Sequence, residues 1–347
     1  MRTARASAAA IGLLLLLAGT APAAGRPLRA LARGRGLAVG AAVGVRPLAA
    51  DPAYRRALAR EFDVCVAENA FKWSALRPSP GRYDFRGADA IAAFARRNGM
   101  RLRGHTLVWH EQLPAWVPAR VHTRDEAVAL LREHIETVMG RYRGRVWAWD
   151  VVNEAVANDG AGLRAESFWH KTIGPDYVEL AFRFARAADP RARLYYNDFD
   201  AEGLNPKSDR VYELLRDLKR RGVPVDGVGW QMHVQSGFRT TADHRENARR
   251  LAALGLELSV TELDVRVPLP ATPEALAAQA ETYGDVTSFC LDTPGVRALV
   301  TWGFTDAHSW VPGFFKGTGA ALPFDERLRP KPAYAAIARA LAARPAR

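Results

Sequence analysis

A regular alternation of short β-rich runs and longer segments with helical periodicity most constrains the fold of this chain, and it begins near Gly36. Because parallel strands need crossover connections, usually helices, this alternation predicts a parallel sheet of the α/β class. Eight strand–helix units predict one single-domain (β/α)8 TIM barrel over residues 37–347. The expected strands are residues 37–43, 64–68, 102–109, 146–152, 194–197, 225–232, 256–263 and 298–304.

The segments between these runs carry the start and stop signals of helices. Thr123 and Glu126 have the spacing of a capping box, and Pro332 suits the first turn of the last helix. Gly222 follows an apolar stripe of helical period and is a plausible helix stop. A doubly wound sheet is the alternative, but the chain has no Gly-x-Gly-x-x-Gly turn and no phosphate-binding Gly-Lys-Ser/Thr.

Composition narrows the class of protein. Of the 347 residues 48% are hydrophobic, which allows a sizeable core and excludes wholesale disorder. The formal charge of +12 raises nucleic acid or an acidic polymer as a partner, but with 43 Arg and only 6 Lys an Arg-rich composition explains the charge without one. The two cysteines, Cys65 and Cys290, exclude a disulfide framework, and we expect both to be buried and free.

The first residues have the pattern of a Sec-type signal peptide. A positively charged start precedes the apolar run 11–17, and small residues offer a cleavage site near Ala23. The run is too short for a membrane span of ~20 residues. We therefore expect residues 1–24 to be a signal peptide, the protein to be secreted, and no membrane attachment to remain after cleavage. Residues 25–36, rich in Arg, Gly and Ala, are expected to be a short linker.

Polar and aromatic residues follow the apolar runs at their carboxyl ends. Barrel strands buried on both faces should be apolar throughout, and barrel enzymes place their sites at the carboxyl ends of the strands. Polar ends on seven strands therefore predict one site on that face. The residues concerned include Glu68, Asn69, Lys72, His105, Trp109, Asn153, Glu154, Gln231, His233, Glu262, Asp264 and Trp302.

Two glutamates at the ends of well-separated strands, Glu154 and Glu262, suit glycoside hydrolysis. One carboxyl must protonate the leaving oxygen while the other stays ionised to attack C1 or to activate water. Trp109, Trp302 and Trp310 offer flat faces for sugar rings. Histidines near carboxylates leave a metal site conceivable, but the spacing matches no familiar ligand set, and we expect neither a metal nor a cofactor.

Five sequence blocks occur in order along the chain: AENAFKW at 67–73, GHTLVWH at 104–110, WDVVNE at 149–154, TELD at 261–264 and WGFTD at 302–306. Any one of them is weak evidence, but the ordered set is specific. It resembles the blocks of glycoside hydrolase family 10, the retaining endo-β-1,4-xylanases.

This resemblance implies a role for each matched position. Glu154 matches the acid/base and Glu262 the nucleophile, while Asn153 matches the residue that bonds the 2-hydroxyl of the sugar being cleaved. His233, with Asp264 behind it, corresponds to the histidine that bonds the nucleophile. The other implied site residues are Gln231 near the acid/base; Lys72, His105, Trp109, Trp302 and Trp310 around the −1 sugar; and Glu68, Asn69 and Gln112 in the next subsite, where the family rejects the hydroxymethyl group of glucose.

We therefore predict an endo-β-1,4-xylanase that cleaves xylan or xylo-oligosaccharides by double displacement with retention. We expect a monomer with no nucleic-acid partner. Glu111 and Phe199 depart from the usual family residues, adding a negative charge and removing a hydroxyl near the predicted site. The alternatives are another retaining (β/α)8 β-glycanase (a mannanase or glucanase), a non-catalytic carbohydrate-binding protein and a basic nucleic-acid binder.

Overall fold

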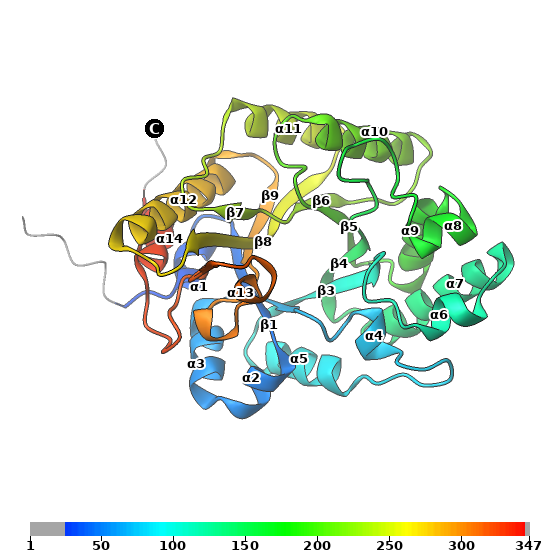
Figure 1. Ribbon diagram of the computed structural model, residues 1–347, viewed down its shortest axis with the longest axis horizontal. Helices are drawn as coiled ribbons and strands as arrows, with labels where there is room; N and C mark the ends of the chain where they lie inside the picture. The colour runs from blue at the N-terminus through cyan, green and yellow to red at the C-terminus, as the bar shows by residue number, and fades with distance from the viewer. Residues whose placement is uncertain (1–24, 344–347) are drawn as a thin grey trace, which may run out of the picture.

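The computed structural model describes residues 25–343, in which helices surround a central ring of strands (Figure 1). Strand β1 (Ala38–Val43) pairs in parallel with both β2 (Val64–Ala67) and β9 (Val296–Thr301), and the ring closes because β9 also pairs in parallel with β8 (Glu257–Pro268). The predicted (β/α)8 barrel is therefore confirmed. The signal peptide predicted for residues 1–24 lies outside the described residues.

Each of the eight expected strands overlaps one strand of the ring. The other ring strands, in spatial order, are β3 (Arg101–Val108), β4 (Val146–Asn153), β5 (Arg193–Asp198), β6 (Gly227–Trp230) and β8 (Glu257–Pro268). Two short strands extend this sheet at β8: β7 (His233–Gln235) runs parallel to it and β10 (Thr318–Gly319) runs antiparallel. The strand expected at 225–232 ends earlier, at Trp230, because Met232 adopts a left-handed φ of 61°.

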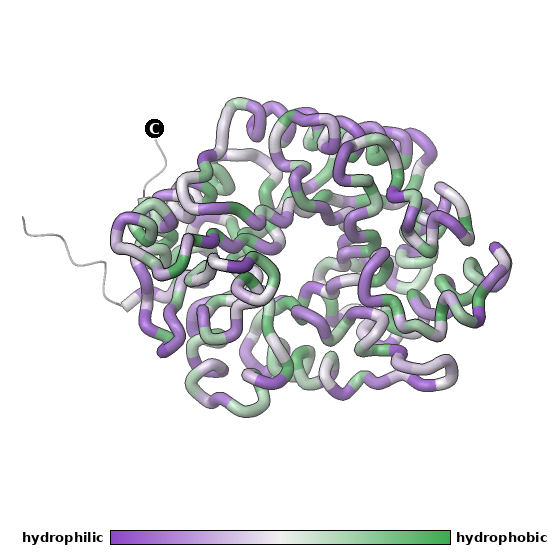
Figure 2. The backbone as a smooth tube through the Cα atoms, in the orientation of Figure 1, coloured by the Kyte–Doolittle hydropathy of each residue, from purple (hydrophilic) through white to green (hydrophobic). Residues whose placement is uncertain are grey.

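The connections between ring strands are mostly helical. The helices are α2 (Val45–Ala50), α3 (Pro52–Glu61), α4 (Trp73–Leu76), α5 (Arg86–Arg97), α6 (Trp116–Arg120), α7 (Arg124–Arg141), α8 (Phe168–Ile173), α9 (Tyr177–Ala188), α10 (Pro206–Arg220), α11 (Ala242–Ala253), α12 (Pro273–Asp292), α13 (Val311–Phe314) and α14 (Pro332–Ala342). Hydrophilic and hydrophobic residues alternate along outer helices such as α10 and α11 (Figure 2), as expected for helices with one face on the sheet.

Two apolar layers hold the barrel together. Alternate residues of β1, such as Val39 and Ala41, belong to the large cluster between strands and helices. Their neighbours Ala38 and Ala42 belong to a smaller cluster that also includes Trp302. Because side chains alternate across a strand, the two clusters correspond to the outside and the inside of the ring.

The predicted helix signals appear where expected. Thr123 caps α7: its side chain accepts a hydrogen bond from the Glu126 backbone N–H, and its own N–H donates to the Glu126 side chain. Pro332 occupies the first turn of α14. Arg side chains lie in the last turn of nine of the described helices, among them α3, α5, α7 and α9, where they complement the negative end of the helix dipole.

The linker predicted at residues 25–36 is wrong. Helix α1 (Leu28–Arg33) occupies most of this segment, and Leu28 and Ala32 are buried in the main core. The Leu28 N–H also donates to Glu61 Oε2 at 3.0 Å. The apolar positions i and i+4 of one helical face were hidden among Arg, Gly and Ala residues, whose abundance favoured a linker.

Both cysteines are buried and unpaired, as predicted: Cys65 lies on β2 and Cys290 on α12. Among residues 25–343, the structure contains no helix with the length and apolar character needed to cross a membrane.

Candidate active site

The predicted site residues meet at the carboxyl ends of the ring strands. Asn153 ends β4, Glu154 follows it, and Glu262 lies within the long strand β8. Each of the fourteen predicted side chains contacts at least one other member of the set or a residue bonded to it. The side chains that the strand-end pattern selected therefore lie together on one face of the barrel.

Glu154 is surrounded by neutral donors. Trp109 Nε1 donates to Glu154 Oε2 at 2.8 Å, and Gln231 Nε2 donates to Glu154 Oε1 at 2.8 Å. Asn153 Nδ2 donates to the same Oε1 at 3.1 Å. The side chain is almost buried, with 9% of the residue exposed. These contacts hold the carboxyl through hydrogen bonds from uncharged side chains.

Glu262 is surrounded by imidazoles instead. His233 Nε2 lies 3.4 Å from Glu262 Oε2, and His105 Nδ1 lies 3.8 Å from Glu262 Oε1. Burial alone would raise the pKa of Glu262, but His105 and His233 more than offset it, so the pKa lies below its ordinary value. Glu262 is therefore ionised at neutral pH. The two carboxyls thus differ in environment: Glu154 is held by neutral donors and Glu262 by imidazoles.

Asp264 explains the charge on His233. The Asp264 Oδ2 atom lies 2.9 Å from His233 Nδ1 and also accepts a hydrogen bond from Trp310 Nε1 at 2.7 Å. Burial alone would lower the pKa of His233, but Asp264 and then Glu262 raise it to about 10. The imidazole is therefore a cation that bridges two carboxylates, and Trp310 fixes the outer one.

A second cation, Lys72, lies near the rings of Trp109 and Trp302. Lys72 Nζ donates to Asn69 Oδ1 at 3.1 Å and lies 4.8 Å from the centre of the Trp109 ring. Burial lowers the pKa of Lys72, and carboxylates led by Glu262 offset only part of this effect. Asn69 also faces Gln112, whose Nε2 lies 3.5 Å from Asn69 Oδ1. These groups form a polar shelf beside the two glutamates, and Glu68 adjoins it as a half-buried carboxyl.

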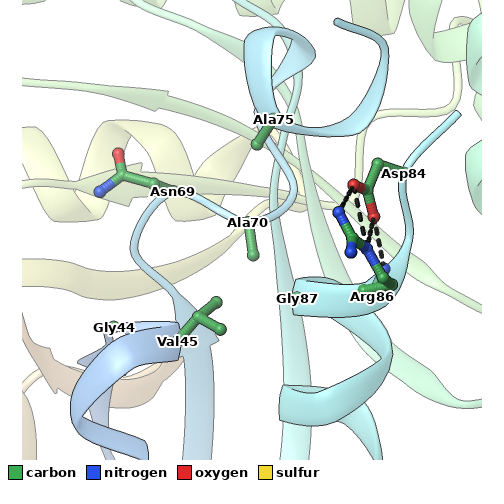
Figure 3. Close-up of a pocket in the computed structure, with 8 residues that line it drawn as sticks. All are labelled: Gly44, Val45, Asn69, Ala70, Ala75, Asp84, Arg86 and Gly87. Carbon is green, nitrogen blue, oxygen red and sulfur yellow. Dashed lines mark hydrogen bonds and ion pairs between the residues drawn. The ribbon is translucent and has the colours of Figure 1, made fainter. Parts of the chain in front are cut away.

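A pocket of about 500 Å³ extends this shelf beyond Asn69 (Figure 3). Its charged residues, Asp84 and Arg86, bond to each other, with Arg86 Nε 2.9 Å from Asp84 Oδ1. The remaining lining residues are Gly44, Val45, Asn69, Ala70, Ala75 and Gly87. The pocket is therefore electrically neutral and lined by small side chains, without an aromatic face.

The residue list from the sequence missed Asn197, at the end of β5. Asn197 Nδ2 donates to Glu262 Oε1 at 2.7 Å and to Asn153 Oδ1 at 2.8 Å, while Thr261 Oγ1 donates to Asn197 Oδ1 at 2.6 Å. Its amide thus links Glu262 to Asn153, the residue before Glu154. The strand-end pattern that identified the other residues also applies to Asn197.

A buried ion pair inside the barrel was also missed. Asp150 accepts from Arg103 Nε at 3.2 Å and faces His105 Nδ1 at 3.0 Å. Arg103 and Asp150 are 0% and 1% exposed. Asp150 of this pair orients His105 toward the site. No local sequence pattern indicates that Arg103 and Asp150 would meet inside the barrel. No cluster of three or more His, Cys, Asp or Glu residues suited to a metal occurs within residues 25–343.

The chain is similar to known xylanases in both sequence and structure. The chain is 44% identical to endo-1,4-beta-xylanase B of Thermotoga neapolitana over 331 residues, covering 94% of this chain and 95% of that protein. The crystal structure of native xylanase 10B from Thermotoga maritima superposes with a TM-score of 0.88 at 46% identity, covering 91% of this chain and 98% of that one. A structure of xylanase 10B from Thermotoga petrophila RKU-1 in complex with xylobiose also has a TM-score of 0.88, at 46% identity and with 91% and 97% coverage.

The family model for glycosyl hydrolase family 10 matches residues 27–340, which is nearly the whole described chain. The match begins just before helix α1 and ends within α14, so it includes the segment that the sequence pattern had set aside as a linker. The family resemblance found in the sequence blocks is confirmed: the chain belongs to glycosyl hydrolase family 10.

Proposed function

We propose that this chain is an endo-β-1,4-xylanase in which Glu262 is the nucleophile and Glu154 is the general acid and base. The observation that carries this assignment is the contrast between the two carboxyls. His233 and His105 keep Glu262 ionised, whereas Glu154 is held by the neutral donors of Trp109, Gln231 and Asn153.

The reaction then proceeds by two displacements. In the first, a Glu262 oxygen attacks C1, the glycosidic C1–O bond breaks, and Glu154 gives its proton to the leaving oxygen. In the second, Glu154 takes a proton from water, the water oxygen attacks C1, and the ester bond to Glu262 breaks. Two inversions at C1 leave the product with the configuration of the substrate.

Asn153 stands beside both carboxyls and is assigned to the 2-hydroxyl of the sugar being cleaved. Its Oδ1 accepts from Asn197, which in turn donates to Glu262, so the amide orientation is fixed before substrate arrives. A contact that strengthens as positive charge develops at C1 stabilises the transition state more than the bound substrate. Preorganisation of this amide avoids reorientation during the reaction.

The substrate class follows from the polar shelf and the aromatic rings. Trp302 packs edge-on against His105 at 5.0 Å between ring centres, and Trp310 against His233 at 4.9 Å, so both rings border the site. Glu68, Asn69 and Lys72 supply hydroxyl partners on the shelf. The neighbour from Thermotoga petrophila was crystallised with xylobiose, which supports xylo-oligosaccharides as the ligand class.

Glu262→Ala and Glu154→Ala test the assignment. Glu262→Ala should lose ~10⁴-fold or more in turnover and regain activity with azide, which occupies the vacated space as a nucleophile. Glu154→Ala should cleave substrates with good leaving groups and fail on poor ones. Glu111→Ala removes an exposed carboxylate at the same rim and is the control. Near-wild-type turnover by Glu262→Ala would refute the nucleophile assignment.

A substrate panel tests the alternatives. We expect reducing-sugar release from xylan to exceed that from mannan or carboxymethylcellulose, whereas the reverse order would favour a mannanase or glucanase. Binding of xylan without hydrolysis would favour a carbohydrate-binding protein, and salt-dependent retention on DNA would favour a nucleic-acid binder.

We also propose export through the Sec pathway, with a mature protein that begins near Ala23 and acts as a monomer. N-terminal sequencing of the secreted protein tests the cleavage site, and sedimentation tests the oligomeric state.

A further inference from the structure

Glu154 adopts an unusual backbone conformation. It is the first residue after strand β4 and has φ = 55°, in the left-handed region that a residue with a Cβ rarely adopts. Such a conformation persists only where the surrounding structure holds it. The position of the Glu154 carboxyl therefore depends on contacts to its own backbone as well as to its side chain.

One tyrosine holds the backbone just after Glu154. The N–H groups of Ala155 and Val156 both donate to the Tyr196 hydroxyl oxygen, each at 3.1 Å. The Glu154 N–H donates to the Asn197 carbonyl at 2.8 Å. From the other side, Arg164 Nε donates to the Glu154 carbonyl at 3.2 Å. The turn after Glu154 is thus fixed from β5.

A buried carboxylate fixes the Tyr196 hydroxyl. This hydroxyl has one proton and two acceptor positions, and it gives its proton to Asp198 Oδ2 at 2.5 Å. Both acceptor positions then face the two backbone N–H groups. Asp198 itself accepts from the Phe199 N–H at 3.0 Å and pairs with Lys207 Nζ at 2.7 Å.

This polar chain is shielded from water. Tyr196 and Asp198 are 0% exposed and Lys207 is 3% exposed. Burial raises the pKa of Asp198 to about 6 against the opposing effect of Lys207. Burial also raises the pKa of Tyr196, which therefore remains a neutral hydroxyl. The chain converges on Asp198: the amides behind Glu154 donate to Tyr196, Tyr196 donates to Asp198, and Lys207 pairs with Asp198 from the other side.

We propose that Tyr196 is a positioning residue for the acid/base: its hydroxyl, oriented by Asp198, holds the turn that aims the Glu154 carboxyl at the leaving oxygen. This inference rests on the proposed role of Glu154. Tyr196→Phe leaves the Ala155 and Val156 N–H groups buried without an acceptor, so the turn relaxes. Trp109 and Gln231 still hold the Glu154 carboxyl, so acid catalysis weakens without being abolished.

The test compares aryl xylobiosides with good and poor leaving groups. For Tyr196→Phe, kcat/KM on a phenyl xylobioside should fall ~10-fold or more, a part of the ~10²–10⁴-fold that general acid catalysis contributes. On a dinitrophenyl xylobioside, which needs no proton to depart, kcat/KM should stay near the wild-type value. Tyr195→Phe is the matched control, because its hydroxyl donates to Glu257 Oε2 at 3.1 Å at the opposite, amino end of β8.

A double variant separates this inference from the proposed function. If Tyr196 acts through Glu154, then Tyr196→Phe should cause no further loss on the phenyl substrate in a Glu154→Ala background. Equal losses on both substrates, additive losses in the double variant, or wild-type rates would overturn the inference. If Glu154→Ala itself shows no leaving-group dependence, the proposed function fails instead.

Asp198→Asn provides a second variant in case Tyr196→Phe folds poorly, which thermal unfolding will show. It keeps the shape of the side chain but removes the charge that orients the hydroxyl. We expect a smaller loss with the same leaving-group dependence, and a loss equal on both substrates would contradict the orienting role.

Discussion

The His233→Asn variant tests why Glu262 is ionised. In the wild type the His233 cation lies 3.4 Å from Glu262 Oε2, and Asp264 holds it in place. Asparagine keeps a donor of similar size but carries no charge. Because His233 is one of the two imidazoles that lower the pKa of Glu262, its loss should raise that pKa.

The size of the effect follows from this separation. Coulomb's law at 3.4 Å with an effective dielectric constant of ~20 gives an attraction of about 5 kcal/mol. Structural relaxation and water that enters the site reduce the net loss of attraction. A net loss of only ~1.4 kcal/mol still lowers the ionised fraction of Glu262 tenfold at pH values below its pKa. We therefore expect activity at pH 5 to fall ~10-fold more than activity at pH 7.

The assay is kcat/KM against pH on an activated aryl xylobioside, where attack by Glu262 dominates. The acidic limb of the profile should move to higher pH in His233→Asn, because the carboxyl must lose its proton before it can attack. His122→Asn, which changes an exposed histidine at the start of α7, should leave the limb in place. An unchanged acidic limb in His233→Asn would refute the electrostatic argument.

Further consequences follow for stability and activity. His233 has a pKa of about 10, above its ordinary value, so its positive charge stabilises the fold fully below pH ~6.5. This stabilisation disappears as the pH rises through 10. Unfolding midpoints measured from pH ~6 to ~11 should therefore fall in the wild type and fall less in His233→Asn. Gly104→Ala should destabilise the protein by ~1–3 kcal/mol in urea unfolding, because a Cβ there would lie 2.1 Å from the Trp149 ring; wild-type stability would contradict the packing. Asn197→Ala should lower kcat on xylan ~10-fold or more with little change in KM, since its amide contacts Glu262 and Asn153; a KM effect alone would place it in substrate binding instead.

The barrel and the clustering of most candidate site residues were predictable because they depend on short-range patterns. Strand β4, for example, is apolar except for Asp150 until it ends in Asn153, and Glu154 follows, so the position of the site is visible in a few residues. Closure of the ring then brings β2, β3, β4 and β8 together without further information. The order of the strands around the ring thus brings residues that are far apart in the sequence into one cluster.

The features that sequence reasoning missed depend on long-range partners. Arg103 would be implausible inside a barrel without Asp150, which is 47 residues away in the chain. Helix α1 is stable because Leu28 and Ala32 reach the core, a fact that its Arg-rich composition conceals. Asn197 shared the strand-end pattern but was left out of the predicted list, and only its contact with Glu262 reveals its place in the site.

The most direct test of the account is to identify the residue that becomes covalently attached to the sugar. A 2-fluoro-xylobioside with a good leaving group slows the second displacement, so the glycosyl-enzyme accumulates and its peptides can be mapped by mass spectrometry. The account predicts one adduct per chain, on the peptide that contains Glu262 and at that residue. An adduct on another carboxyl, or no adduct together with release of the inverted anomer from natural substrate, would contradict it.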